Sequence, residues 1–266
     1  MKSVKIKLAG ALILSLIMVN TLVGQGVADK KIQAGLTTTM GLNMLSMETS
    51  KMQTNGIGSN LGIGVLIHSG LKSSKNLGIS YGLEFEFGSF KFKPANGNAV
   101  FYNYNDSEII SAKDTANSKG IFALASRKQN PVYLTIPLMF LFRTDFIGDF
   151  RYFGKFGVKN SFLISSKIND KGTDLLKSPN DIVEFSNMKS PGETFFYNGM
   201  IGMNLGAEWN FIGSTCLVAE AGYFYGLTPL FLDRKADKES LYLIDGTTFS
   251  NSAKLSQILL KVSILF

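Results

Sequence analysis

The sequence has little of several features that would each define a class of protein. It contains a single cysteine, so no disulfide can form within the chain. It contains a single histidine, which excludes sites built from several histidines and weakens the case for a hydrolase with a serine and histidine pair. Proline is scarce, at 6 residues, and charged residues make up only 18%. Glycine (27 residues), phenylalanine (21) and tyrosine (9) are plentiful instead, which favours β-sheet over disorder.

Long apolar runs are also scarce, and the longest lies near the N-terminus. Three lysines precede the run LAGALILSLIMV, and small residues follow it between positions 24 and 28. This order is typical of a secretory signal, so we expect residues 1–28 to be cleaved and residues 29–266 to form the mature domain. A retained transmembrane helix is the alternative, but Ser15, Asn20 and Thr21 shorten its apolar part.

Excess charge of one sign is small once the signal is removed. Loss of Lys2, Lys5 and Lys7 lowers the formal net charge from +7 to +4. The mature sequence has no cluster of lysine and arginine, so it lacks the basic footprint of a nucleic-acid-binding protein. We therefore exclude nucleic acid as a partner.

Bulky apolar residues alternate with small or polar ones along most of the mature sequence. In YGLEFEFG, Phe85 and Phe87 share one face, and Glu84 and Glu86 share the other. A period of two residues indicates β-strands. Pro137, which lacks an N–H, predicts a bulge or a bend within its strand. The pattern predicts eight strands, at residues 31–43, 57–68, 77–88, 132–142, 151–167, 194–209, 217–226 and 255–266.

Strands with one bulky face and one face of Gly, Ser, Asn, Glu and Lys indicate a transmembrane barrel. The bulky side chains would meet lipid, and the small and charged ones would fill the interior. We therefore predict an all-β fold, an eight-stranded antiparallel up-and-down transmembrane β-barrel in the bacterial outer membrane. A soluble ligand-carrying barrel, with its apolar faces inside, is the alternative fold.

The lengths of the connections support the transmembrane barrel independently. Connections that follow odd-numbered strands are long, and those that follow even-numbered strands are short. Long external loops that alternate with short periplasmic turns are typical of outer-membrane barrels. The long connections are 43–56, 93–130, 168–193 and 229–253, and the short ones are 69–76, 143–150 and 210–214.

The segment PVYLTIPLMFLFRTDFIGDFRYFGKFGVKNSFLISSK, residues 131–167, contains a YLxIPL strand, a short turn and a YxGxxG strand. It resembles the middle of the PorT-like outer-membrane β-barrel family of Bacteroidota. The resemblance implies an eight-stranded barrel and an outer-membrane location. The family is broad, and its namesake serves protein secretion and gliding. The resemblance implies no catalytic residue. The matching positions are Tyr133, Leu134, Ile136, Pro137, Leu138, Tyr152, Phe153, Gly154, Phe156 and Gly157.

Charged residues of both signs fall on the inward face of the predicted barrel. An eight-stranded barrel is just wide enough inside for side chains, so we expect these residues to pack as a polar plug. Each buried charge needs a partner, because an unpaired one is costly. A small solute pore, with a water path past these charges, is the alternative. The predicted inward polar network is Glu84, Glu86, Lys155, Lys159, Glu208, Glu220 and Lys261.

Two further groups of residues are candidates for contacts outside the barrel. Phe101, Tyr102 and Tyr104 lie in the longest external connection, where they would contact sugars or a partner protein, or pack within their own loop. The outward residues of the final strand resemble the signal that the outer-membrane insertion machinery reads. These outward residues are Val262, Ile264 and Phe266.

The sequence thus predicts a non-enzymatic barrel that needs no metal or cofactor. Its expected partners are outer-membrane lipid, the insertion machinery during assembly, and envelope proteins that contact its external loops. We expect a structural or accessory role, in secretion or surface assembly. His68 is expected to be structural or solvated and Cys216 to be inert, and a lipid-modifying enzyme is the least favoured alternative.

Overall fold

The computed structural model describes residues 31–71, 74, 76–212, 215–232 and 238–266. The predicted signal, residues 1–28, lies outside this range. Within the described residues, no helix is long and apolar enough to cross a membrane. The strands are β1 (Ile32–Met47), β2 (Met52–Thr54), β3 (Gly58–Gly70), β4 (Leu77–Gly88), β5 (Phe90–Pro94), β6 (Val100–Asn105), β7 (Glu108–Ile109), β8 (Gly120–Arg143), β9 (Phe150–Asp174), β10 (Ser178–Met188), β11 (Tyr197–Ile212), β12 (Thr215–Gly226), β13 (Leu241–Leu243), β14 (Thr248–Phe249) and β15 (Ala253–Leu265).

Eight of these strands form a closed antiparallel ring, in the order β1, β3, β4, β8, β9, β11, β12 and β15. The ring closes where β15 pairs with β1, from Gly35 opposite Leu265 to Met47 opposite Ala253. Closure leaves no sheet edge exposed to lipid. Each of the eight predicted strands coincides with one strand of the ring, so the predicted eight-stranded antiparallel barrel is confirmed.

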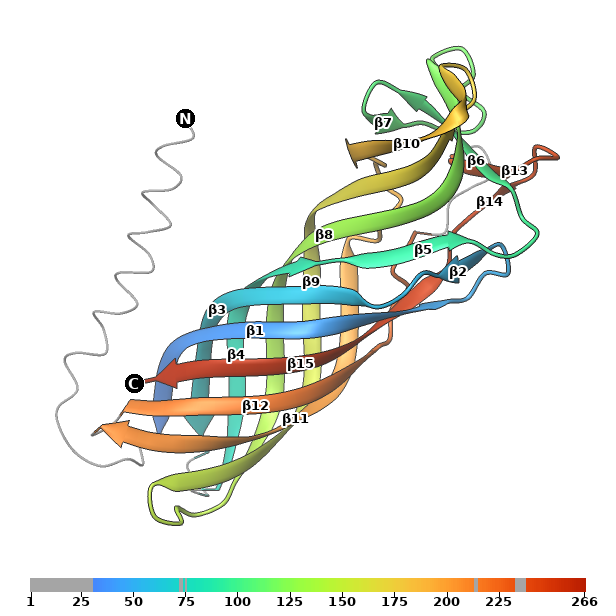
Figure 1. Cartoon of the computed structure of the whole chain (residues 1–266). Coiled ribbons are helices and arrows are strands. Elements are labelled where there is room, and N and C mark those ends of the chain that lie inside the picture. The colour runs from blue at the N-terminus through green and yellow to red at the C-terminus, as the bar shows by residue number, and fades with distance from the viewer. Residues whose placement is uncertain (1–30, 72–73, 75, 213–214, 233–237) are drawn as a thin grey trace.

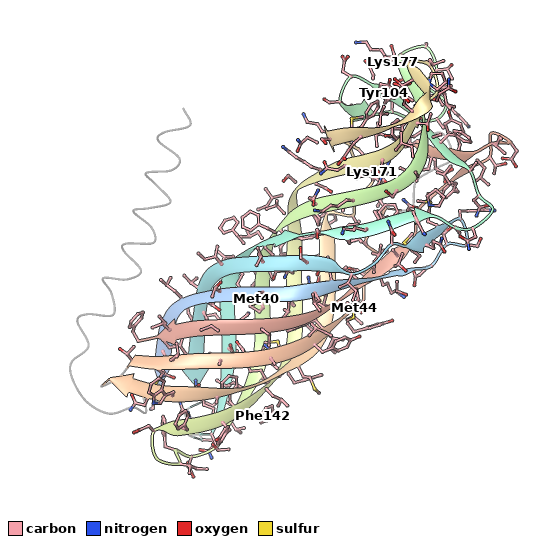
Figure 2. The ribbon with its side chains drawn as sticks, viewed as in Figure 1. Met40, Met44, Tyr104, Phe142, Lys171 and Lys177 are labelled. Atoms are coloured by element: carbon pink, nitrogen blue, oxygen red, sulfur yellow. The ribbon has the colours of Figure 1, made fainter. Side chains whose placement is uncertain are left out.

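The two faces of the ring strands carry opposite kinds of side chain. On β3, Leu61 and Ile63 are 59% and 62% exposed, whereas Asn60 is buried. Figure 2 shows such outward side chains around the ring, with Met40 and Phe142 labelled. Exposed apolar and buried polar side chains are the reverse of a soluble sheet. The outer surface therefore suits hydrocarbon, and a soluble ligand-carrying barrel with an apolar interior is excluded.

Pro137 lies within β8 without a bulge, so that part of the prediction was wrong. β8 keeps a continuous register with β9 across this position, where Pro137 is opposite Lys159. On the β4 side, ladder pairs are missing at Gly82 and Leu83, but the register is the same before and after this gap. The proline therefore removes pairing on one side only, as expected for a residue without an N–H.

β8 and β9 continue far beyond the ring. They contain 24 and 25 residues, whereas a membrane-crossing strand needs about 9–11. Their distal halves pair with β5, β6 and β10, and β6 pairs with β13. Figure 1 shows this projection at one end of the barrel and the short turns at the other. We call the described residues of 48–57, 89–130, 167–195 and 227–252 the extension. The long connections that form it are largely β-sheet, so the expectation that they are loops was wrong.

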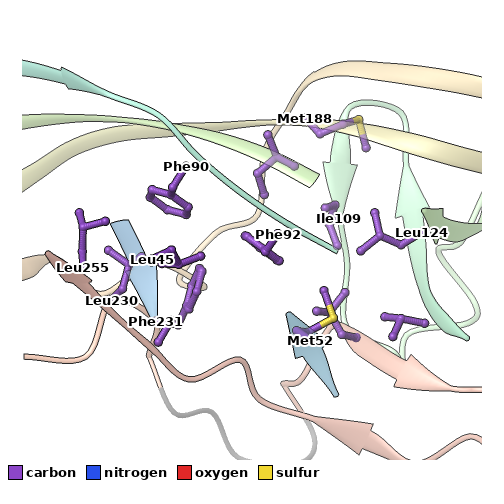
Figure 3. Packing of buried hydrophobic residues seen from close by; sticks show 14 of the residues in the cluster. Leu45, Met52, Phe90, Phe92, Ile109, Leu124, Met188, Leu230, Phe231 and Leu255 are labelled. Atoms are coloured by element: carbon purple, nitrogen blue, oxygen red, sulfur yellow. The ribbon is translucent and has the colours of Figure 1, made fainter. Parts of the chain in front are cut away.

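The extension has a hydrophobic core that continues into the mouth of the barrel. Phe90 and Phe92 are fully buried, and their rings pack edge to face on Phe231 with centroids 6.1 and 5.6 Å apart. Figure 3 shows these rings gathered with Leu230 and Leu255. Burial of each such side chain stabilises the fold by about 1.5–3 kcal/mol. This core joins connections that are far apart in sequence into one unit over the mouth of the barrel.

Candidate functional site

The structure places all seven predicted inward residues in the barrel interior and joins six of them in ion pairs with one another. The two partners of each pair come from strands that are not neighbours in the ring: β4 with β15, β4 with β9, and β9 with β12. Each pair therefore reaches across part of the lumen, past one or two intervening strands, and we call the three the lumen-spanning pairs. The pairs are Lys261–Glu84 at 2.5 Å, Lys159–Glu86 at 2.7 Å and Lys155–Glu220 at 2.9 Å.

Neutral side chains complete the hydrogen bonding of the carboxylates. Thr39 Oγ1 donates to Glu84 at 3.1 Å, and Asn60 Nδ2 donates to Glu86 at 3.1 Å. Asn204 does the same for the third pair, at 3.0 Å. Buried charges are tolerated when they are both paired and hydrogen-bonded, and loss of one partner of such a pair costs about 3–5 kcal/mol. The three pairs are therefore tied to the stability of the barrel.

Small residues leave the room that these pairs occupy. Gly62 and Gly64 of β3 lie directly opposite Glu86 and Glu84. A Cβ atom at Gly64 would lie 2.2 Å from the carbonyl oxygen of Leu83, closer than atoms approach in real structures. The glycine face that predicted the interior thus has a direct steric role beside the charges.

A second charged cluster closes the end of the barrel that carries the short turns. Glu208, the seventh predicted residue, accepts a hydrogen bond from Arg151 Nε at 2.8 Å and lies 3.3 Å from Arg143. Arg143 Nη2 lies 2.8 Å from Nδ1 of His68, which is 3.4 Å from Glu208. His68 is buried within this cluster, 1% exposed. It does not face solvent.

The sequence analysis missed both arginines of this cluster. Arg143 was assigned to a short turn, although it has the same strand parity as the buried Leu141. Arg151 has the same parity as Lys155 and Lys159 in the predicted fifth strand. Extension of the period-two pattern to the ends of these strands would have identified both as inward charges.

Little open space remains among the lumen-spanning pairs. The cavity between them has a volume of about 10 Å³, roughly the space that one water molecule requires. Opposite charges in contact around so small a space form a plug. The charged side chains that line this cavity are Glu84, Lys155, Lys159, Glu220 and Lys261.

The extension contains a further buried charge, Arg127, which the sequence analysis had assigned to a loop. Its guanidinium donates to Asp170 from Nε at 2.9 Å and from Nη2 at 2.8 Å, and to Glu193 from Nη1 at 3.0 Å. It also lies over the rings of Phe92 and Tyr102. Burial alone would lower the pKa of Arg127, but the two carboxylates raise it above its usual value. Arg127 is therefore a permanent cation that organises the extension.

The aromatic residues proposed for loop contacts lie mainly inside the extension. Tyr102 and Tyr104 are buried on β6, and Tyr104 Oη donates to Asp174 at 2.5 Å. Phe101 points to the other face, is partly exposed, and stacks on Tyr242 with centroids 5.9 Å apart. The rings of Tyr102 and Tyr104 therefore pack within their own segment and offer no face to an external partner.

The outward residues of β15 lie on the apolar surface of the barrel. Val262, Ile264 and Phe266 are each 45–46% exposed. The N–H of Phe266 donates to the carbonyl of Ala34 at 2.8 Å, at the seam between β15 and β1. Recognition of this face by the insertion machinery stays a prediction. Among the described residues, no cluster of three or more His, Cys, Asp and Glu side chains could hold a metal ion.

The sequence model of the family described as outer membrane protein beta-barrel domain matches residues 24–232. The chain belongs to this family. As a member of the outer membrane protein beta-barrel domain family it is a bacterial outer-membrane protein, and the predicted location is confirmed. The match identifies no narrower branch. Among curated proteins, no sequence matches.

Similar solved structures are outer-membrane proteins with very different sequences. OprG from Pseudomonas aeruginosa is 11% identical, with 90% of this chain and 98% of that chain covered and a TM-score of 0.38. Ail, the attachment invasion locus protein of Yersinia pestis, is 11% identical, with 89% of this chain and 100% of that chain covered and a TM-score of 0.32. The outer membrane protease OmpT from Escherichia coli is 10% identical, with 91% of this chain and 98% of that chain covered and a TM-score of 0.35. Similarity this low carries no information on activity.

Proposed function

We propose that this protein is a closed, non-conducting barrel that acts as a structural or accessory component of the cell envelope through its extension. The observation that carries the proposal is the set of three ion pairs across the lumen, around a cavity of about 10 Å³. A solute would have to displace paired, hydrogen-bonded charges to pass, which is costly in a buried site. A solute pore is accordingly disfavoured.

The work of the protein is assigned to the extension. Long connections of outer-membrane barrels face the outside of the cell, so the extension lies there and the short turns lie in the periplasm. The extension exposes large apolar side chains near its turns: Leu176 is 66% exposed, Ile182 78% and Ile244 82%. We take these three side chains as the candidate contacts with another protein.

The resemblance of residues 131–167 to PorT-like barrels favours secretion or surface assembly as the process. A catalytic role has no support from the single histidine or the single cysteine. His68 and Cys216 are both buried within the barrel wall and its interior, below the lumen-spanning pairs. We therefore propose that the protein is not an enzyme.

Single-channel recording in planar bilayers tests the closed interior. The purified wild-type barrel should produce no conductance steps. A variant with Glu84, Lys261, Glu86 and Lys159 all replaced by serine serves as the matched open control, because it removes two of the three pairs. Regular steps from the wild type would overturn the closed-barrel proposal.

Site-specific photo-cross-linking tests the role of the extension. A photoreactive phenylalanine analogue at position 182 should give an adduct with another envelope protein in intact cells. The same analogue at Leu138, which is exposed on the ring strand β8, is the matched control and should give no protein adduct. Absence of a protein adduct from positions 176, 182 and 244 would contradict the accessory role.

A further inference from the structure

Three exposed lysines lie together on the outer surface of adjacent strands at the base of the extension. Lys91 on β5 is directly opposite Lys128 on β8. Lys167 on β9 is opposite Asn130, which is two residues from Lys128 on the same face of β8. All three side chains are exposed. We call Lys91, Lys128 and Lys167 the basic patch.

The basic patch has no internal compensation for its charge. Like charges directly opposite each other on neighbouring strands destabilise a sheet. None of these three lysines forms an ion pair with any described residue, in contrast to the next lysine along β9, Lys171, which pairs with Glu184 on β10 at 3.4 Å. Three adjacent unpaired cations on one sheet face are costly unless an anion lies between them.

The position of the basic patch along the membrane normal follows from the apolar outward residues on the same strands. On β8 the outward face is apolar up to Val132, and on β9 it is apolar up to Ile164, which is 55% exposed. Lys128 is four residues beyond Val132, which is about 14 Å along the strand, or about 10 Å along the membrane normal at a tilt of about 40°. The polar headgroup layer of each leaflet is about 5–8 Å thick, and lysine side chains reach several ångströms toward it. In Figure 2, Lys171 of the extension lies above the lipid-facing surface marked by Met40.

We propose that Lys91, Lys128 and Lys167 bind the phosphate groups of outer-leaflet lipid. The patch lies just beyond the apolar surface of the barrel on the same strands, so a lipid whose acyl chains lie against Val132 and Ile164 carries its headgroup toward the lysines. Lysine ammonium groups bind phosphate as point charges. Basic clusters next to the apolar span of a membrane protein bind anionic lipids in the same way. Binding of the phosphate relieves the repulsion between Lys91 and Lys128.

The test measures binding of lipid A that carries two phosphates to the full-length mature protein in neutral detergent, by native mass spectrometry. The double variant K91Q/K128Q should bind this lipid about 30-fold more weakly, because each lysine near a membrane surface contributes about 1 kcal/mol and 1.36 kcal/mol is tenfold. The control K113Q/K189Q removes the same net charge from exposed positions far along the extension and should bind as the wild type does. All three proteins should keep the mobility difference between boiled and unboiled samples that marks a folded barrel.

The source of the phosphate is tested in the same assay. Lipid A stripped of its phosphates should bind to the wild type as weakly as intact lipid A binds to K91Q/K128Q. Inorganic phosphate at a concentration equal to that of the lipid should not displace intact lipid A. The proposal is overturned if K91Q/K128Q binds intact lipid A as tightly as the control variant does. It is also overturned if the stripped lipid binds as tightly as the intact one, or if inorganic phosphate displaces it.

Discussion

Removal of one partner of a lumen-spanning pair should destabilise the barrel far more than removal of both. In Lys261→Met, Glu84 stays buried among β3, β4 and β15 and keeps only the hydrogen bond from Thr39. In the wild type, Nζ of Lys261 lies 2.5 Å from Oε1 of Glu84. An unpaired buried charge of this kind costs about 3–5 kcal/mol, whereas replacement of both partners by neutral groups of similar volume is close to neutral. We therefore expect Glu84→Gln combined with Lys261→Met to recover most of the loss.

The free energy of unfolding is measured by urea titration of the barrel folded in lipid vesicles. The single tryptophan, Trp209, reports the transition because it lies on β11, 37% exposed, with its ring stacked on Phe150. Lys113→Met, at an exposed position of the extension, is the control for loss of a lysine and should change the free energy by less than about 0.5 kcal/mol.

A loss below about 1 kcal/mol in Lys261→Met would refute the reasoning, because it would place the pair in an environment as wet as a protein surface. A double variant less stable than the single one would refute it as well. That result would mean that packing around the pair, and not compensation of charge, determines its contribution.

Three further predictions concern other parts of the molecule. Arg127→Met should strand two buried carboxylates at a cost of about 3–5 kcal/mol, so limited proteolysis should cut the extension while the ring keeps its heat-dependent gel mobility; uncut protein would contradict the role given to this arginine. Gly64→Val should abolish folding, because the new Cβ meets a backbone carbonyl at 2.2 Å, whereas Gly70→Ala, with 3.5 Å to its nearest atom, should fold normally; a folded Gly64→Val barrel would contradict this. Burial raises the pKa of both Tyr102 and Tyr104 above the ordinary value of 10.0, so their contribution to stability is complete below about pH 10 and is lost as the pH rises further. Phenolate absorbance at about pH 11 should therefore show fewer ionised tyrosines in the folded protein than in the unfolded chain, and equal numbers would be inconsistent with the burial of these rings.

The eight ring strands were predictable because each has a complete period-two pattern over the length that lipid imposes. The pattern assigns a face to every residue, so it also placed Glu84, Lys155 and Lys261 inside. It did not predict which of them pair, because the partners come from strands separated by one or two others in the ring. That choice depends on strand tilt and stagger, which a single sequence does not contain.

The extension was missed because the alternation reverses its meaning where the strands leave the membrane. Along β4 and β5 the even-numbered positions stay inward, yet they change from Glu84 and Glu86 to the buried Phe90 and Phe92, while the odd-numbered positions change from exposed Phe87 to Lys91. A search for a constant apolar face ends the strand at this point.

On β8 and β9 the outward face changes from apolar to polar in the same way, whereas the inward face keeps the charged Arg127 and Asp170. A register shift between Leu124 and Ser126 moves the inward positions of β8 to the even-numbered Leu124 and Phe122, and on β9 a register shift near Ser165 adds one residue and moves the inward positions from odd to even numbers. The change of the outward face from apolar to polar therefore marks the boundary between hydrocarbon and water on three neighbouring strands. Since Lys91, Lys128 and Lys167 are among the first outward charges beyond that boundary, the same sequence feature that hid the extension also locates the lipid phosphates that these lysines are proposed to bind.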